Sequence, residues 1–356
     1  MARRPTLRLF LTGVALGATL LVIPACETGG GGNRTVSNTP ATRRSATAGF
    51  AQITATPTPT PSAHSTPTST PHHSPTPTPN PIPTSSGNTG VSVGFDVAFD
   101  LATATPWNDI TEDDLFAIQT TAGSGLDDTS EGVSSINVPQ WVANVHAHHR
   151  LALITIGGIA DQHWEIACNA TYRSAFVTNL VTYMKSNGFD GIDLDIEDDA
   201  WSAQGPPSAA MNTCAEAIAS AAHATTTAAG ARPLVSEDVT TPWMGSWVAP
   251  FQSDIDQFNL MTYGDSCANS CSQFASDIQS TIQEGVTEKS KFVLGIDLID
   301  TSPQQNDPAD CGSIANYALQ QGFAGVMVWD IHGDAVLHNG HFPCFDQIAP
   351  YVVAPK

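Results

Sequence analysis

Four carboxylates stand close together near the middle of the chain, in the stretch Asp190-Gly-Ile-Asp193-Leu-Asp195-Ile-Glu197. A β-strand here would place Asp193, Asp195 and Glu197 on one face, because side chains alternate between the two faces of a strand. Carboxylates this close raise one another's pKa, since each negative charge opposes ionisation of the next. Glu197, at the end of the strand, would then hold a proton that it can donate, which is the property of a general acid.

The elements that must position these acids begin at Val91, where strand-like apolar runs start to alternate with segments of helical length. Helices are predicted most clearly at Tyr172–Ser186, Ala209–Ala229, Phe274–Glu284 and Ser313–Gln320. Eight strands are predicted, at Val91–Ala98, Leu115–Thr120, Leu151–Ile156, Gly191–Ile196, Leu234–Val239, Phe258–Thr262, Phe292–Ile296 and Gly325–Trp329. This pattern favours a single (β/α)8 (TIM) barrel of the α/β class over an open doubly wound sheet.

In such a barrel the three carboxylates would point inward and climb toward the C-terminal rim, where barrel enzymes form their active sites. Two plainer interpretations exist. A solvated sheet face conflicts with a barrel strand, because both sides of that strand are covered. A Ca²⁺ or Mg²⁺ site would also use carboxylate oxygens. We favour acid catalysis over both and expect no metal and no cofactor. No glycine fingerprint follows the first strand, so dinucleotide binding has no support.

Residues 1–90 differ in kind from the rest. Arg3, Arg4 and Arg8 precede an apolar run from Leu9 to Ile23 that is too short for a membrane span, which predicts a signal peptide over residues 1–25. The following Pro-Ala-Cys26 resembles a bacterial lipoprotein box, so Cys26 is a candidate lipidation site, against the plainer interpretation of an ordinary signal peptide. We therefore expect an extracellular or cell-surface protein, attached to a membrane, if at all, through this anchor.

The segment 26–90 is rich in Gly, Thr and Pro and has almost no large apolar side chains, which predicts a disordered spacer ahead of a catalytic domain at 91–356. Six cysteines remain in that domain: Cys168, Cys214, Cys267, Cys271, Cys311 and Cys344. In an exported protein they predict disulfides of undetermined pairing. Half of a metal site at Cys267 and Cys271 is the weaker alternative, since no second pair has zinc-like spacing.

The charge of the domain limits its partners. Residues 91–356 hold seven basic and 33 acidic residues, a formal charge of −26. Such a surface repels phosphate backbones and anionic lipid, so nucleic-acid binding is disfavoured. A neutral or basic substrate is compatible, and we expect a monomer.

With the strands in place, the acidic stretch resembles the signature of glycoside hydrolase family 18, the chitinases and endo-β-N-acetylglucosaminidases. That signature, Asp-x-x-Asp-x-Asp-x-Glu on the fourth barrel strand, is matched at each fixed position by Asp190, Asp193, Asp195 and Glu197. The resemblance extends over roughly residues 91–353. Further segments similar to the family's strands three, six and eight are Thr155-Ile-Gly157-Gly158, with Thr155 in place of the usual Ser, Met261-Thr-Tyr263 and Gly325-Val-Met-Val-Trp329. In one departure, Gly264 separates Tyr263 from Asp265, whereas the family usually has Asp directly after the tyrosine.

The resemblance implies a substrate-assisted retaining mechanism. In it Glu197 would protonate the glycosidic oxygen, and the acetamido carbonyl of the substrate would attack its own anomeric carbon. Asp195 would orient the acetamido N–H, Asp193 would tune Asp195, and Tyr263 would bind the acetamido oxygen. The implied substrate is β-1,4-linked N-acetylglucosamine, in chitin or its oligosaccharides.

Aromatic side chains suit a sugar cleft, because apolar sugar faces stack on flat rings. Trp329 is expected to form the floor of the site. The remaining expected substrate-binding residues are Met261, Asp190, Gly157, Gly158, Trp243 and Trp201. Trp247 is equally compatible with the core, and Glu237 and Asp238 fit plain rim charges better than cleft residues.

Two other functions remain open. A chitinase-like lectin would bind sugar without cutting it, but such relatives usually replace the last Glu of the signature, which is present here as Glu197. An endo-β-N-acetylglucosaminidase would release N-glycans from glycoproteins, and the signature does not separate it from a chitinase.

Overall fold

The structure of the chain is a computed structural model. It describes residues 90–102, 104–197, 208–240, 244–299, 302, 304–337 and 340–352. The predicted signal peptide, Cys26, the linker before residue 90, Trp201 and Trp243 lie outside the described residues.

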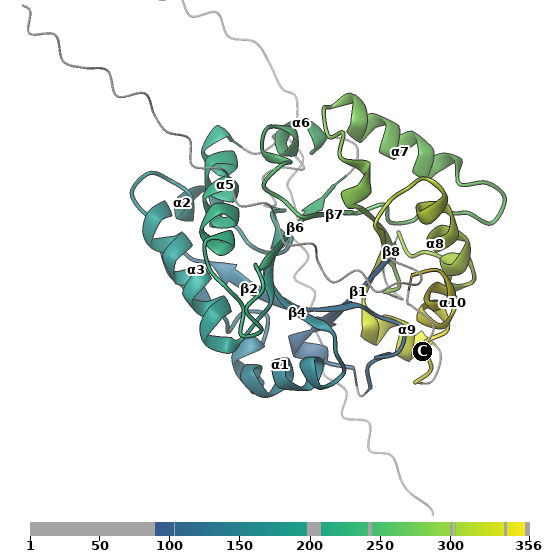
Figure 1. The fold of residues 1–356 in the computed structure, drawn as a ribbon, viewed down its shortest axis with the longest axis horizontal. Coiled ribbons are helices and arrows are strands. Elements are labelled where there is room, and N and C mark those ends of the chain that lie inside the picture. Colours follow the sequence, from purple (N-terminus) through teal and green to yellow (C-terminus); the bar gives the residue numbers. More distant parts are fainter. Residues whose placement is uncertain are drawn as a thin grey trace, which may run out of the picture. The chain divides into compact units, whose positions relative to one another are not determined.

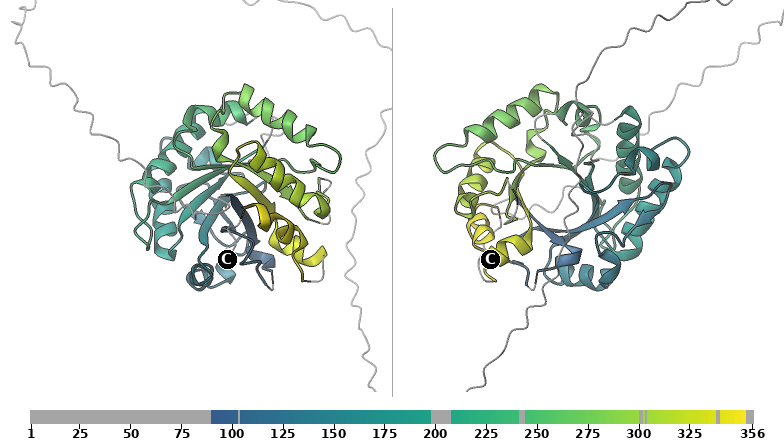
Figure 2. Two further views of the ribbon diagram at one scale, coloured as in Figure 1. Left: turned by 45° about the vertical axis from the view of Figure 1, so that its right-hand side comes forward. Right: turned by 180° about the vertical axis from the view of Figure 1, so that it is seen from behind.

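Eight parallel strands close into a barrel (Figure 1), in the order β1-β9-β8-β7-β6-β5-β4-β2, and a direct β1–β2 pairing completes the ring. Figure 2 shows the same ring from behind, with helices around its outside. The predicted (β/α)8 barrel is therefore confirmed. The strands are β1 Val91–Val97, β2 Glu112–Thr120, β4 Leu151–Gly157, β5 Gly191–Asp195, β6 Leu234–Val239, β7 Gln257–Leu260, β8 Phe292–Asp297 and β9 Gly325–Trp329. A short β3, Leu126–Asp127, pairs antiparallel with the end of β2.

Helices cover the outside of the barrel. They are α1 Val138–Ala147, α2 Trp164–Ala167, α3 Arg173–Asn187, α5 Ala209–His223, α6 Gly245–Val248, α7 Ser272–Gln283, α8 Cys311–Gln320, α9 Ile331–Leu337 and α10 Pro343–Val352. The four predicted helices correspond to α3, α5, α7 and α8. The prediction for α5 was too long, because the Ala-rich pattern continues to Ala229 whereas the helix ends at His223.

The second strand is longer than predicted. It begins at Glu112 rather than at Leu115, and the three added residues are Glu112, Asp113 and Asp114. A run of acids argues for solvent, but all three side chains are almost fully buried. Local sequence preference is overridden here by the closure of the barrel, which pairs Glu112, Asp113 and Asp114 with β1 on one side and β4 on the other.

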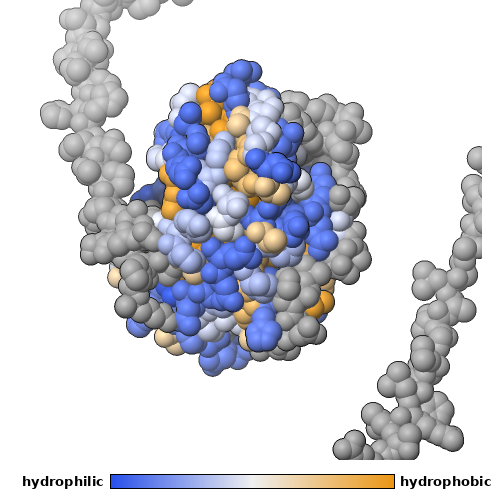
Figure 3. Space-filling view, turned by 90° about the vertical axis from the view of Figure 1, so that its right-hand side faces the viewer, coloured by the Kyte–Doolittle hydropathy of each residue, from blue (hydrophilic) through white to orange (hydrophobic). Residues whose placement is uncertain are grey.

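The apolar core has two parts. The larger lies between the strands and the helices and includes Ile192, Leu194 and Ile196. A smaller cluster lies on the inner side of the strands and comprises Val93, Phe95, Phe116, Ala117, Val293 and Met327. The outer face that carries α7, α8 and α10, seen in Figure 3, is mainly hydrophilic. Within the part of the chain that the structure describes, no helix is long and apolar enough to span a membrane.

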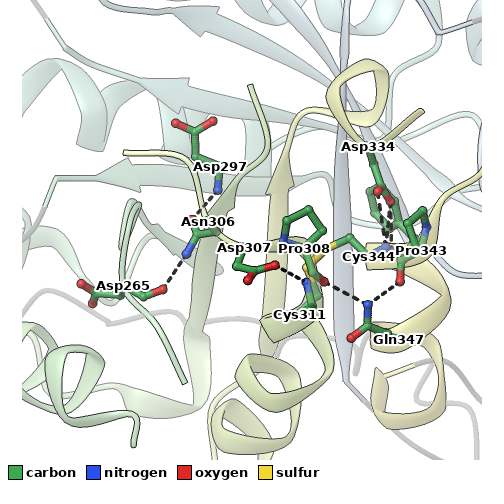
Figure 4. The surroundings of a disulfide bond; sticks show 12 residues. Asp265, Asp297, Asn306, Asp307, Pro308, Cys311, Asp334, Pro343, Cys344 and Gln347 are labelled. Carbon is green, nitrogen blue, oxygen red and sulfur yellow. Dashed lines mark hydrogen bonds between the residues drawn. A yellow bond between two sulfur atoms is a disulfide. The ribbon is translucent and has the colours of Figure 1, made fainter. Parts of the chain in front are cut away.

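All six domain cysteines form disulfides, as predicted. Cys168 after α2 joins Cys214 on α5, and Cys311 on α8 joins Cys344 on α10. Cys267 joins Cys271, so both thiols of the alternative metal site are consumed. Around Cys311–Cys344 (Figure 4), Asp334 accepts hydrogen bonds from the backbone N–H of Cys344, which fixes the start of α10 against α9.

Candidate active site

Strand β5 delivers the acidic motif to the inside of the barrel. Asp193 and Asp195 point inward and are almost fully buried, whereas Ile192 and Leu194 face the helices. Glu197 follows two residues after the strand and is partly exposed. The predicted alternation of inward acids and outward aliphatic side chains is therefore present. Asp193 lies deepest in the barrel, and Glu197 lies nearest its C-terminal end.

Asp195 and Glu197 are joined by a hydrogen bond between their carboxyl groups. A bond between two carboxyls requires a proton, and burial, followed by the charges of Glu197, Asp238 and Asp193, raises the pKa of Asp195 well above its usual value. Asp195 is thus the protonated donor and Glu197 the acceptor. Asp195 Oδ1, moreover, receives no hydrogen bond from an N–H or hydroxyl group.

Asp193 lies two residues before Asp195 on the same face of β5. Side chains from three other strands donate hydrogen bonds to it. It accepts hydrogen bonds from Thr155 Oγ1 on β4 at 3.0 Å, Ser236 Oγ on β6 at 2.6 Å and Asn259 Nδ2 on β7 at 3.2 Å. Burial raises its pKa to about 6, and these bonds limit the rise because they favour the anion.

Tyr263 and Trp329 come to the same end of the barrel as Glu197. The pKa of Tyr263 is well above its usual value, because the ring is desolvated and the charges of Asp238, Asp195 and Glu197 act on its hydroxyl group. Trp329 ends β9 and packs edge-on against Phe95 and Phe116, with ring centroids 5.6 and 4.6 Å away. Met261 also packs on this inner cluster. The structure thus gathers Asp193, Asp195, Glu197, Tyr263, Trp329 and Met261 at one mouth.

These observations are matched by similarity to known proteins. Residues 116–312, more than half of the chain, match the model of glycosyl hydrolases family 18. The chain belongs to glycoside hydrolase family 18. No curated protein sequence matches it.

Solved family 18 chitinases share the fold. A chitinase from Bacteroides thetaiotaomicron is 16% identical, with a TM-score of 0.60 over 74% of this chain and 96% of that one. A chitinase from Rhizomucor miehei is 15% identical, with a TM-score of 0.56 over 73% and 99% of the two chains. A class V chitinase mutant from Nicotiana tobaccum in complex with NAG4 is 16% identical, with a TM-score of 0.56 over 74% and 99%.

Of the residues of the family 18 signature regions, Asp190 lies away from the mouth of the barrel, whereas Gly157 and Gly158 lie at the C-terminal end of β4. Asp190 precedes β5, at the end of the barrel opposite Glu197, and accepts hydrogen bonds from His146 Nε2 at 2.7 Å and Ala152 N at 3.0 Å. Its predicted contact with substrate does not fit this position, and it instead ties α1 and β4 to the base of β5. Gly157 and Gly158 support the backbone: a Cβ on Gly157 would meet Asp195 O at 1.8 Å, and Gly158 N donates to that same oxygen at 2.9 Å.

Two further sequence interpretations are settled by burial. Trp247 is buried and packs edge-on against Phe251, so it belongs to the core and not to the rim. Asp265, displaced by Gly264 from the usual family 18 position, is buried and has a pKa raised to about 7 by burial and by the charge of Asp277. Asn306 donates to its backbone oxygen at 2.6 Å and lies between Asp265 and Asp297 (Figure 4).

Two inward-facing carboxyls of this family 18 barrel, Glu112 and Asp114 on β2, were not predicted as site residues, and a third, Asp238 on β6, was predicted at the rim. The interpretation of Glu237 and Asp238 as rim charges was wrong, because both are buried. Asp238 faces the interior with Asp193, whereas Glu237 pairs with Leu194 and Phe258 on the helix side. Glu112 and Asp114 stand in a continuous run of acids with Asp113, so no alternation of the kind that marked β5 was present to find them.

Glu112 makes the stability of the barrel pH-dependent. Burial, then the charge of Asp193, raises its pKa from 4.5 to about 8. A raised carboxyl pKa means that the folded state keeps a proton which the unfolded state loses, so stability falls as the pH rises from 4.5 to 8. Glutamine is always neutral. We therefore expect the free energy of unfolding of Glu112→Gln to equal that of wild type at pH 4 and to exceed it by about 2–4 kcal/mol at pH 8.

Urea unfolding between pH 4 and pH 9 measures this difference. The amide of the Glu112→Gln variant can still bond to Gln257, whose Nε2 donates to Glu112 Oε1 at 3.0 Å in the wild type. Glu165 is exposed, so Glu165→Gln serves as the matched control. The difference between its free energy of unfolding and that of wild type should not grow with pH. A Glu112→Gln variant that is less stable than wild type at pH 8 would show that Glu112 is held as an anion.

Proposed function

We propose that this chain is a glycosidase that hydrolyses β-1,4-linked N-acetylglucosamine in chitin or its oligosaccharides. The observation that carries the proposal is the bond from the protonated Asp195 to Glu197 at the mouth of the barrel, with the Tyr263 hydroxyl group near enough for the charges of both to act on it. This set offers a proton donor, a group to orient an amide N–H and a hydroxyl for an amide oxygen. It matches a sugar that carries a 2-acetamido group.

The proposed reaction needs no protein nucleophile. Glu197 takes the proton of Asp195 along their hydrogen bond and passes it to the glycosidic oxygen while the acetamido carbonyl oxygen of the substrate attacks the anomeric carbon, and the bond to the leaving sugar breaks. Asp195, left as a carboxylate, accepts a hydrogen bond from the acetamido N–H as the oxazolinium ion forms, and the Tyr263 hydroxyl group donates one to the acetamido oxygen. Water then attacks the anomeric carbon and breaks its bond to the acetamido oxygen, gives a proton to the Glu197 carboxylate and releases a product of retained configuration.

The rim of the mouth supplies apolar surface for sugar rings. Phe99, just after β1, is 66% exposed, and Ile159, just after β4, is 65% exposed. Parallel strands bring both residues to the same end of the barrel as Glu197. Exposed apolar side chains beside a polar site are typical of a binding surface, and these two extend the floor that Trp329 would provide.

A paired digest tests the proposed substrate. N-acetylglucosamine hexamer and a high-mannose glycoprotein are incubated with the wild-type protein and the products are analysed by mass spectrometry. We expect shorter chito-oligosaccharides from the hexamer and an intact glycoprotein. Release of the glycan alone would move the assignment to an endo-β-N-acetylglucosaminidase. Tight binding of the hexamer without cleavage would instead indicate a chitinase-like lectin.

Trp329 gives a prediction on substrate binding. Trp329→Ala should raise KM for the hexamer about 3- to 10-fold, because loss of one stacking ring costs about 0.5–1.5 kcal/mol beyond lost area. Steady-state kinetics measure the change. Trp247→Phe is the matched control, since that ring lies in the core against Phe251 and should alter thermal stability but not KM. Equal KM values for Trp329→Ala and wild type would remove Trp329 from the sugar site.

We further propose that the chain is exported. The basic and apolar start of the sequence supports a signal peptide, and the three disulfides of the barrel fit an oxidising compartment. Anchoring through a lipid on Cys26 is the associated proposal. Fractionation of cells that express wild type and Cys26→Ser tests both, because loss of the anchor should move activity from the membrane to the medium. Cytoplasmic protein with intact residues 1–25 would contradict export.

A further inference from the structure

Asp193 uses its full capacity to accept hydrogen bonds. A carboxylate offers about four acceptor sites. Thr155, Ser236 and Asn259 occupy three of them, and the fourth is occupied by a hydrogen bond from Asp238 on β6. Asp238 is thus the only one of the four donors that is itself a carboxyl group.

The proton between Asp193 and Asp238 belongs to Asp238. A carboxylate that accepts three bonds from neutral donors is stabilised as the anion. Asp238 accepts from Asn259, but its Oδ1, though buried, receives no hydrogen bond from an N–H or hydroxyl group. In agreement with this, burial and the charge of Asp193 raise the pKa of Asp238 well above its usual value, which favours its protonated form.

The state of Asp193 decides where Asp195 donates its proton. Asp195 has two carboxyl neighbours along β5, Asp193 below and Glu197 above, and each could accept its proton. Since Asp193 has no free acceptor site, the bond goes to Glu197. An unfilled site on Asp193 would offer Asp195 a second acceptor and draw it away from the mouth of the barrel.

We propose that Asp238 is a positioning residue for the glycosidase reaction: its proton fills the last acceptor site of Asp193 and so directs Asp195 to Glu197. The inference rests on the proposed function. Asp238 acts through Asp193 and does not touch the substrate, so its replacement should change kcat more than KM.

The pH range of this arrangement follows from the groups around Asp238. It faces Asp193, Asp195, Glu197, Asp114 and the Tyr263 hydroxyl group, with Glu237 beside it on β6. All of these are acids or a neutral phenol. Loss of the Asp238 proton at high pH would therefore place two repelling anions side by side, and activity should decline on the alkaline side as Asp238 ionises.

Two substitutions separate the role of the proton from that of the side chain. Asp238→Ala removes the donor and should lower kcat on the hexamer about 10- to 100-fold, because small displacements of catalytic groups have effects of this size. Asp238→Asn retains an N–H donor for Asp193 and an oxygen for Asn259 and no longer ionises. It should recover most of the activity that alanine loses and extend the alkaline limb of the pH profile.

Glu237→Gln provides the matched control. Glu237 is the next residue on the same strand and is equally buried, but it faces the helices. Its replacement should leave kcat and the pH profile unchanged whatever it does to stability. The positioning role is overturned if Asp238→Ala and Asp238→Asn have the same kcat, or if Glu237→Gln moves the pH profile as Asp238→Asn does.

An infrared measurement tests the proton without any substrate. At neutral pH, Asp238→Asn should remove intensity from the C=O band of protonated carboxyls, whereas Asp193→Asn should remove intensity from the carboxylate band. The reverse result would place the proton on Asp193 and overturn the inference. Because this readout needs no turnover, a protein that cleaves neither substrate contradicts the proposed function alone, and the proton assignment is still tested.

Discussion

Glu197→Gln is expected to lower kcat on N-acetylglucosamine hexamer by about 10²- to 10⁴-fold, which is the usual contribution of a positioned general acid. Glutamine keeps the size of the side chain and can still accept the hydrogen bond from Asp195. It has no proton to donate to the glycosidic oxygen and cannot later activate water. Steady-state kinetics measure the loss, and calorimetric titration with the hexamer should show that binding is retained.

The choice of leaving group sharpens this test. A nitrophenol leaving group needs little protonation. Glu197→Gln should therefore slow the first step on an aryl glycoside of this kind much less than it slows cleavage of the hexamer. Similar losses on both substrates would mean that Glu197 acts by something other than acid catalysis. Full activity of Glu197→Gln on the hexamer would contradict the assignment altogether.

Removal of the Cys168–Cys214 disulfide is the second large effect. The two cysteines are fully buried and lie 46 residues apart, so the bond closes a long loop between α2 and α5. In the chain-entropy model a loop of this length corresponds to about 4 kcal/mol. We expect Cys168→Ala/Cys214→Ala to lower Tm by about 10 °C. Differential scanning calorimetry measures the change.

The short disulfide Cys267–Cys271 is the internal comparison. It spans only four residues in sequence, and the same model assigns it about 2 kcal/mol. Cys267→Ala/Cys271→Ala should therefore lower Tm by about half as much as the first pair. An equal or larger loss from the short loop would show that local packing, and not loop closure, sets the contribution of these bonds.

Sequence alone determined the features that depend on local period. Alternation of acids and aliphatic residues in 190–197 placed Asp193 and Asp195 on one side of β5, and the spacing of apolar runs located eight parallel strands. Both patterns repeat every two residues along one strand, so neighbours in sequence suffice to detect them. The expected position of Trp329 at the floor of the site came instead from the resemblance of its segment to strand eight of family 18.

Contacts between strands were decided only by the tertiary structure. The donors to Asp193 come from Thr155, Ser236 and Asn259, on three strands whose register becomes known only when the barrel closes. Burial likewise separated Trp247 in the core from Trp329 at the mouth, and Asp190 at the base from Glu197 at the rim.

The acids of β2 and β6 show the physical reason most clearly. In the sequence, Glu112, Asp114 and Asp238 look like exposed charges, because an isolated carboxylate is costly to bury. The closed barrel buries them all the same, beside Asp193 and Asp195, and burial raises the pKa of each of the three, which favours the protonated form. The sequence determined which carboxylates could do chemistry, and the closure of the barrel decided which of them keep their protons.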